Sequence, residues 1–365
     1  MNKAGTILEE KVDRMLQQFG EKCPGSANAA GIYDNTSVDI WTSGFWPGIL
    51  WIMHDLTKKE HYRQAAWKWD RDMELKMLEE NEFLHDVGFQ FLSTAVIKYK
   101  LTGDEDAKRR GLSAANFLAG RFNLAGNYIR AWKWRGDEGW AIIDCLMNLP
   151  LLFWASEESG DPRFKHIALA HAETVLNYFI RPDGSVNHIV SFNPDSGDYI
   201  ESLGGQGYGP DSSWSRGQSW ALYGLAVLYR ITGDKRFLDA SKKVAHYFIS
   251  ALPDDYVPYW DFRVPSLADE PRDTSAGAIA ASGLLELEEL LPEFEGRLYR
   301  NWANKILTSL TEKYTRYDDP AYEGILASGT GHKPEGRHIN VPLIYGDYFY
   351  VEALAKLNGW KMKVY

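Results

Sequence analysis

One kind of turn recurs along this chain of 365 residues and constrains its fold more than any other feature. It appears as LTGD at 101–104, as ESGD at 158–161 and as ITGD at 231–234, and an amphipathic run with helical spacing follows each copy. A looser copy, LTKK, lies at 56–59. Glycine favours the end of a helix and aspartate favours its beginning. Each copy therefore predicts a tight connection between two antiparallel helices.

A second type of helix, apolar on almost all sides, alternates with these amphipathic runs. Successive copies begin about 60 residues apart, an interval that suits one helical hairpin with its loops. Helices that are apolar all round are buried, whereas amphipathic helices cover them from outside. The apolar helices are expected to begin near six positions, which are Trp41, His85, Ala141, Trp214, Asp273 and Gly346.

Six such hairpins predict an all-α fold, an (α/α)6 barrel in which residues 1–365 form a single domain. An open solenoid is the alternative arrangement of helical hairpins, and the closed barrel is favoured over it. In a closed barrel the N-termini of all inner helices emerge at one end. Long connections at 181–213 and 316–345 are expected to surround that end, with a pair of short strands at 185–202.

Composition excludes several kinds of partner. The chain carries 40 Lys and Arg against 50 Asp and Glu, a net charge of −10 without a basic run, which argues against nucleic acid and anionic membranes. The N-terminus lacks the apolar core of a signal peptide, and no apolar stretch approaches membrane-spanning length. Two cysteines, Cys23 and Cys145, allow one disulfide at most. A reducing cytoplasm is the expected compartment.

Two aspartates stand near the starts of largely apolar helices, Asp86 in LHDVGF and Asp144 in AIIDCLMNLP. An aspartate at this position is commonly just an N-cap. The apolar neighbours of Asp144 would, however, raise the pKa of its carboxyl by desolvation. A carboxyl that stays protonated near neutral pH is what a general acid requires. Two acids that meet at one barrel mouth favour catalysis over capping.

Aromatic residues make up 14% of the chain, and several lie near the same predicted end. Core packing accounts for most of them, but an aromatic cleft that contains carboxylates suits a sugar, whose C–H faces stack on rings. Arg216, at a helix N-terminus, either holds a carboxylate or hydroxyls or forms a structural ion pair. His188 is either a substrate contact or an ordinary loop histidine. No metal-ligand pattern occurs, so no metal and no cofactor are expected.

Seven segments follow one another in a characteristic order, namely WTSGFWPGILW, HDVGF, IRAW, IIDCLMNLPLLFWA, QGYGPDSSWSRGQSWALYG, YWDF and YGDYFYVEAL. Together, over residues 30–357, they resemble the unsaturated glucuronyl hydrolases of glycoside hydrolase family 88. The resemblance implies an (α/α)6 barrel, in agreement with the helical repeat. It also implies a small substrate, a lyase-generated chondroitin or hyaluronan disaccharide whose non-reducing end is a 4,5-unsaturated glucuronic acid.

Such enzymes hydrate the vinyl ether of the unsaturated sugar instead of attacking the glycosidic bond directly. By position, Asp144 matches the family's proton donor and water-activating residue, and Asp86 matches its second essential acid. The resemblance assigns substrate contact to seven further residues, Trp41, Phe45, Trp132, His188, Gln206, Arg216 and Trp220.

This sequence departs from some members of the family at two places that bear on sulfated substrates. Gly205 replaces a larger polar side chain, and the loop 332–338 lacks a serine-rich sulfate-binding pattern. In that loop His332, Lys333 and Arg337 are expected to face an anionic second sugar.

Four alternatives remain beside the interpretation of the chain as an unsaturated glucuronyl hydrolase. An unsaturated rhamnogalacturonyl hydrolase would share the fold and chemistry but act on pectin fragments, and the segment 205–218 favours the glucuronyl enzyme. A sugar 2-epimerase would place paired histidines at the mouth, where only His85 begins an inner helix. An inverting glycosidase would use two separated carboxylates on a saturated substrate. A non-catalytic carbohydrate-binding protein would need no acid at all.

Overall fold

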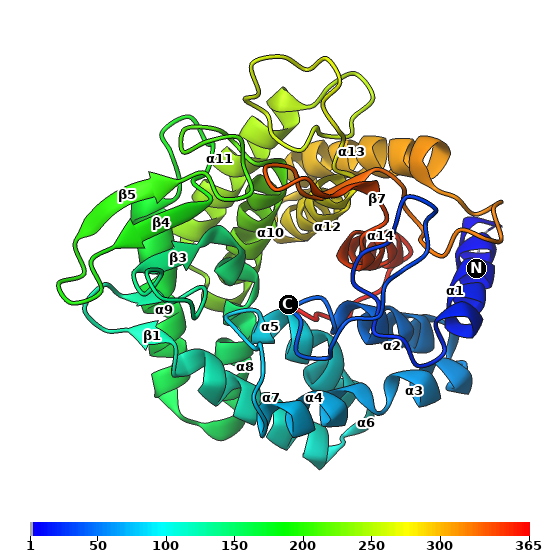
Figure 1. The fold of residues 1–365 in the computed structure, drawn as a ribbon, viewed down its shortest axis with the longest axis horizontal. Coiled ribbons are helices and arrows are strands. Elements are labelled where there is room, and N and C mark those ends of the chain that lie inside the picture. The colour runs from blue at the N-terminus through cyan, green and yellow to red at the C-terminus, as the bar shows by residue number, and fades with distance from the viewer. Residues whose placement is uncertain (1–2) are drawn as a thin grey trace.

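The computed structural model describes residues 3–365 as a ring of helices in two layers (Figure 1). The chain passes from the outer to the inner layer in six successive hairpins. The outer layer contains α1 (Lys3–Phe19), α3 (Glu60–Ala66) with α4 (Trp69–Met77), α7 (Glu105–Ala119), α9 (Pro162–Tyr178), α11 (Lys235–Ala251) and α13 (Glu293–Ser309). The inner layer contains α2 (Phe45–Thr57), the continuous α5 (Val87–Phe91), η1 (Leu92–Val96) and α6 (Ile97–Thr102), then α8 (Leu149–Ser159), α10 (Ser215–Thr232), α12 (Thr274–Leu290) and α14 (Ile344–Leu357).

The inner helices close on themselves. Helix α10 packs against α12 and α12 against α14, after which α14 contacts α2, α2 contacts η1, α5 contacts α8 and α8 contacts α10. Helix α12 is buried along nearly its whole length, whereas α11 buries one stripe of residues, Phe237, Ser241, Val244, Ala245 and Phe248. This division matches the two helix types in the sequence. The predicted (α/α)6 barrel is confirmed, and the open solenoid is wrong.

The recurring turns have the predicted geometry. Three inner helices end at a glycine in the left-handed conformation with φ of 71°, namely Gly103, Gly160 and Gly233. The aspartate that follows each glycine accepts a hydrogen bond from a backbone N–H in the first turn of the next outer helix; these residues are Asp104, Asp161 and Asp234. Glycine avoids the steric cost of positive φ there, and the aspartate satisfies an unpaired donor.

One inner helix begins later than predicted. Instead of a helix from Ala141, the chain forms strand β3 (Trp140–Ile142), a 3₁₀ turn η2 (Ile143–Met147) and then α8. Pro150 lies in the first turn of α8, where its missing N–H costs nothing; in a longer helix its ring would clash with the preceding turn. Asp144 therefore lies in the 3₁₀ turn and not at the start of an α-helix.

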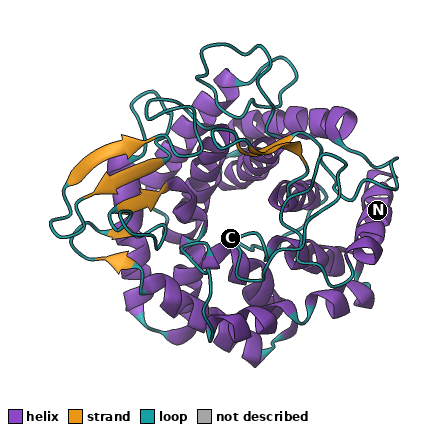
Figure 2. Cartoon of the chain, in the orientation of Figure 1, coloured by secondary structure: helices purple, strands orange, loops and turns teal. Residues whose placement is uncertain are grey.

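The named strands all lie in connections that lead from an outer helix to the next inner one (Figure 2). Strands β3, β4 (Ile189–Phe192) and β5 (Tyr199–Leu203) form an antiparallel sheet, so the strand pair expected at 185–202 is confirmed. Two hairpins complete the set, β1 (Phe122–Asn123) with β2 (Tyr128–Ile129) and β6 (Gly329–His332) with β7 (Arg337–Val341). All of them thus gather at the end where the inner helices begin.

The last residues of the chain run back into the ring (Figure 1). They contact the C-terminal ends of the inner helices, at the end of the barrel opposite to the strands. Trp360, Val364 and Tyr365 are buried there. Cys23 and Cys145 are both buried free thiols. No helix within residues 3–365 is long and apolar enough to cross a membrane.

Candidate active site

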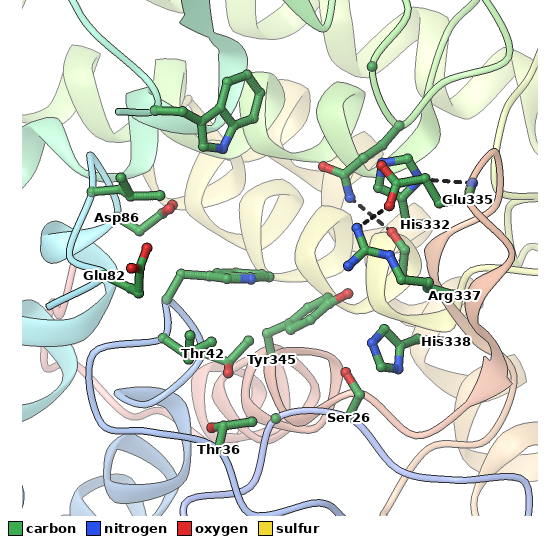
Figure 3. Close-up of a pocket in the computed structure, with 18 of the residues that line it drawn as sticks. Ser26, Thr36, Thr42, Glu82, Asp86, His332, Glu335, Arg337, His338 and Tyr345 are labelled. Carbon is green, nitrogen blue, oxygen red and sulfur yellow. Dashed lines mark hydrogen bonds and ion pairs between the residues drawn. The ribbon is translucent and has the colours of Figure 1, made fainter. Parts of the chain in front are cut away.

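A cavity of about 510 Å³ opens at the end of the barrel where the inner helices begin. Its walls come from the connection before α2, the start of α5, the loops around β4 and β6, and the start of α14 (Figure 3). Of the nine residues that the sequence assigns to catalysis or substrate contact, five line it, namely Trp41, Asp86, Trp132, His188 and Gln206. Residues from separate hairpins therefore converge as the closed barrel predicts.

Asp86 occupies the N-cap position of α5, yet its side chain makes no capping hydrogen bond. It is 8% exposed, and burial raises the pKa of its carboxyl to about 7, against a smaller opposing effect of Arg121. His85 Nε2 lies 3.2 Å from Asp86 Oδ1, but burial lowers the pKa of His85 to about 3. The imidazole beside Asp86 is therefore neutral, and the capping interpretation of this aspartate has no support.

Asp144 lies on η2 next to the cavity and is not among the residues that line it. Burial, together with a smaller effect of the nearby Asp86, raises the pKa of its carboxyl to about 8, against an opposing effect of Arg216. Its Oδ1 atom is buried without a hydrogen-bond partner in the described part of the chain. Asp144 is thus a carboxyl that stays protonated near neutral pH and has one oxygen uncommitted.

Asn148, which sequence reasoning missed, ties the two acid-bearing segments together. Its Oδ1 accepts a hydrogen bond from the backbone N–H of Phe89 at 2.7 Å, and its Nδ2 donates to the carbonyl of Asp144 at 3.3 Å. Gly88 packs so closely that an added Cβ would lie 2.5 Å from the Asn148 Cα. This contact holds α5 against η2 and keeps both carboxyls within electrostatic reach.

Arg216 forms a structural ion pair. Its Nη1 donates to Asp273 Oδ2 at 2.5 Å and to the carbonyl of Thr330 at 2.7 Å, and its Nη2 donates to the carbonyl of Gly331 at 2.6 Å. The side chain is 1% exposed and lies outside the cavity wall. The sequence left open whether Arg216 holds a substrate or forms a structural ion pair, and these contacts support the ion pair. The pair connects β6 with α10 and α12. The charge still acts on Asp144 from a distance.

Breaking this pair is expected to destabilise the protein strongly. The Asp273→Ala substitution leaves Arg216 buried without its carboxylate, which typically costs about 3–5 kcal/mol. Urea unfolding of the variant measures the loss. Glu173→Ala is the matched control, because it removes an exposed partner of Arg236 and such pairs contribute about 0–1 kcal/mol. Equal losses in both variants would contradict the prediction.

The aromatic residues divide into a wall and a layer beneath it. Trp41 and Trp132 line the cavity together with Trp134 and Tyr345, and the Trp41 and Tyr345 rings lie 4.7 Å apart. Phe45 and Trp220, also expected as substrate contacts, are 0% exposed and are absent from the cavity wall. Two large hydrophobic residues predicted from the resemblance therefore support the wall from below.

His188 and Gln206 are linked to each other and to the rim. The backbone N–H of Gln206 donates to His188 Nδ1 at 2.9 Å, and the Gln206 side chain donates to the Gly331 carbonyl at 2.9 Å. Gly205, the departure noted in the sequence, has φ of 55°, and a Cβ there would lie 2.3 Å from His188 Nδ1. A larger residue at this position would collide with the histidine, so the glycine and His188 fit as a pair.

The outer rim carries charges from β6 and β7. His332 and Arg337 line the cavity as expected (Figure 3). Lys333 lies outside the wall, 3.9 Å from Glu270. Glu335 pairs with both His332 and Arg337. Trp134, an aromatic expected near the mouth, lines the wall, whereas sequence reasoning missed Tyr345, Thr42 and Gln90. Gln90 alone had a local signal, since it follows Asp86 by one helical turn.

The closed helical barrel carries two protonatable carboxyls beside an aromatic cavity at one end. This arrangement is that of a glycoside hydrolase. The chain belongs to Glycosyl Hydrolase Family 88, whose sequence profile matches residues 9–359. The resemblance inferred from the seven segments is confirmed, and with it the enzyme class.

Named relatives are similar over nearly their whole length. The chain is 37% identical to an unsaturated glucuronyl hydrolase of Bacillus sp. strain GL1 over 354 residues, 94% of this chain and 93% of the relative. It is 33% identical to an unsaturated chondroitin disaccharide hydrolase of Streptococcus agalactiae over 375 residues, 97% of this chain and 92% of the relative. The crystal structure of the Bacillus sp. GL1 enzyme superposes with a TM-score of 0.94 at 36% identity, covering 98% and 96% of the two chains.

Proposed function

We propose that this protein releases 4,5-unsaturated glucuronic acid from the non-reducing end of glycosaminoglycan disaccharides produced by lyases. The observation that carries the proposal is Asp144, a carboxyl with its pKa raised to about 8 by burial, coupled to Asp86 at an aromatic cavity. An enol ether is hydrated only after protonation at carbon, and that step needs a neutral acid at working pH.

In the proposed reaction Asp144 gives its proton to C4. The electron pair of the C4=C5 bond forms the new C–H bond, and positive charge develops on C5 and the ring oxygen. Asp144, now a carboxylate, takes a proton from a water molecule whose oxygen bonds to C5. The hemiketal opens to a ketone at C5, and the hemiacetal left at C1 releases the second sugar. Asp144 then ends the cycle protonated, because the water proton replaces the one that it gave.

The other site residues have distinct proposed roles. Asp86 supports the charge that develops beside Asp144, and Trp41 and Trp132 offer rings on which a sugar face stacks. His188 and Gln206 provide polar contacts at the wall. Arg216 contributes its charge and the position of β6, while Phe45 and Trp220 act from beneath the wall. We further infer one catalytic domain over 1–365 that works in the cytoplasm, where free Cys23 and Cys145 stay reduced.

A panel of unsaturated disaccharides tests the proposal. Chondroitin and hyaluronan products are expected to lose the ultraviolet absorbance of their C4=C5 bond when the enzyme is added. A faster loss with a rhamnogalacturonan product would reassign the substrate to pectin fragments. No loss with any of the three would contradict the proposal and favour a protein that binds sugars without turning them over.

A further inference from the structure

We propose that Tyr365, at the far end of the barrel from the cavity, is a positioning residue that sets the cavity wall through a column of aromatic rings. The aromatic column consists of Tyr365, Phe349, Phe89, Phe45 and Trp41. The proposal rests on the proposed function, because its readout is turnover of an unsaturated disaccharide.

The tail that carries Tyr365 is fastened to the C-terminal ends of the inner helices. Trp360 Nε1 donates to Asp55 Oδ2 at the end of α2 at 2.8 Å, and Lys100 at the end of α6 donates to the carbonyl of Lys363 at 2.8 Å. Lys363 pairs with Glu286 and Glu289 at the end of α12 at 2.9 and 2.7 Å.

Arg230, at the end of α10, donates to the main-chain oxygen of Tyr365. The same guanidinium pairs with Glu286 at 2.6 Å. The tail therefore contacts the C-terminal ends of α2, α6, α10 and α12. The Tyr365 side chain lies within the ring that these helices form and is 3% exposed. Its position is set by four separate inner helices.

From there the rings lead up the barrel axis to the cavity. The Tyr365 ring stacks on Phe349 at 5.7 Å and meets the edge of Phe89 at 6.1 Å. Phe349 contacts Phe45 at 5.8 Å, and Phe45 and Phe89 contact Trp41 at 5.7 and 5.9 Å. Trp41 lines the cavity.

The column also reaches the catalytic layer. Phe89 lies three residues after Asp86 on the five-residue helix α5, and its backbone N–H is the donor to Asn148 that ties α5 to η2. Phe45, Phe89 and Phe349 are each 0% exposed. Rings packed this closely cannot shift singly, because protein interiors pack like crystals. If the Tyr365 ring were removed, the rings of Phe349 and Phe89 would therefore move into its place, and Trp41 in the cavity wall would move with them.

The Tyr365→Ala substitution tests this role. It is expected to raise KM for the unsaturated disaccharide about 3- to 30-fold, the range typical of coupling through packed side chains, with a smaller change in kcat. Tyr365→Phe keeps the ring and is expected to retain the wild-type KM. The space vacated in the alanine variant is bordered by the rings of Phe349, Phe89 and Tyr348, and a small aromatic molecule that binds there would push the settled rings back to their original places. Adding p-cresol to Tyr365→Ala is therefore expected to lower KM again.

Tyr299→Ala is the matched control. Tyr299 is a tyrosine of the outer helix α13, 1% exposed, whose ring stacks on His246 away from the column. Its removal costs stability as the removal of Tyr365 does, but leaves the cavity wall in place and KM unchanged. If Tyr365→Ala fails to fold, Tyr365→Leu provides a smaller void with the same expected direction.

The outcomes separate this proposal from the proposed function. Absence of turnover by the wild type on every disaccharide would overturn the function. Normal wild-type turnover with an unchanged KM in Tyr365→Ala, or with a KM rise equal to that of Tyr299→Ala and no response to p-cresol, would overturn the positioning role.

Discussion

Replacing Asp144 by asparagine is expected to lower kcat by about 10²- to 10⁴-fold, the range found when a general acid–base group is lost. The amide cannot give a proton to C4, nor can it take one from the water that adds to C5. Binding is expected to change little, because the amide has the same shape as the neutral carboxyl that it replaces. The loss therefore falls on kcat, with KM within a few-fold of the wild type.

The measurement follows ultraviolet absorbance of the C4=C5 bond at saturating substrate. Asp211→Asn serves as the control, because it makes the same chemical change at an exposed residue of the loop before α10. A variant Asp144→Asn that retains a tenth of the wild-type rate would contradict the role of Asp144 as proton donor. In that case Asp86, whose pKa is also raised by burial, would be the next candidate.

The pattern of helices was predictable from the sequence because local signals define it. The Gly-Asp turns reappear as left-handed caps at Gly103, Gly160 and Gly233, and the alternation of apolar and amphipathic runs gives the two layers. The late start of α8 also has a local signal, Pro150, which favours the first turn of a helix. Closure of the ring was predicted from the number of hairpins, since no residue encodes it locally.

The depth of a side chain along the barrel was not predictable. Trp220 follows Arg216 by four residues within α10, about one helical turn and 5.4 Å of rise, and Phe45, the first residue of α2, follows Trp41 in the preceding turn by the same interval. The spacing suggests that each pair lies together and says nothing of how far below the mouth the second member lies. The structure puts both second members beneath the wall with no exposed surface.

Hydrogen-bond partners that are distant in the sequence could not be predicted either. Arg216 was correctly recognised as able to form an ion pair, but Asp273 is 57 residues away and the carbonyls of Thr330 and Gly331 are 114 and 115 residues away. The link from Asn148 to Phe89 spans 59 residues. Such contacts depend on which hairpins become neighbours, and so they appear only in the folded barrel.

A stability measurement tests the electrostatics of the site without any substrate. Asp86→Asn is expected to make the protein more stable than the wild type at neutral pH, although it alters a proposed active-site residue. The pKa of Asp86 is raised by burial to about 7 in the folded chain, against about 3.9 for an unfolded aspartate. Between those values the folded state binds more protons than the unfolded state, so the free energy of unfolding falls as pH rises.

The asparagine variant lacks this titration, and it also loses the part of the raised pKa of Asp144 that comes from Asp86, which changes the difference in the same direction. Its stability relative to the wild type is therefore expected to rise from pH 4 to pH 7 and then to level off, by an amount on the order of 2–4 kcal/mol at about 1.4 kcal/mol per pKa unit. Burial also lowers the pKa of His85, His171 and His188 to about 3, but these imidazoles affect both proteins alike and cancel in the difference. Urea unfolding at several pH values measures it, with Asp211→Asn expected to stay within about 0.5 kcal/mol of the wild type throughout. A difference curve for Asp86→Asn that is flat, or that slopes the other way, would show that Asp86 is ionised in the folded barrel and that burial does not raise its pKa.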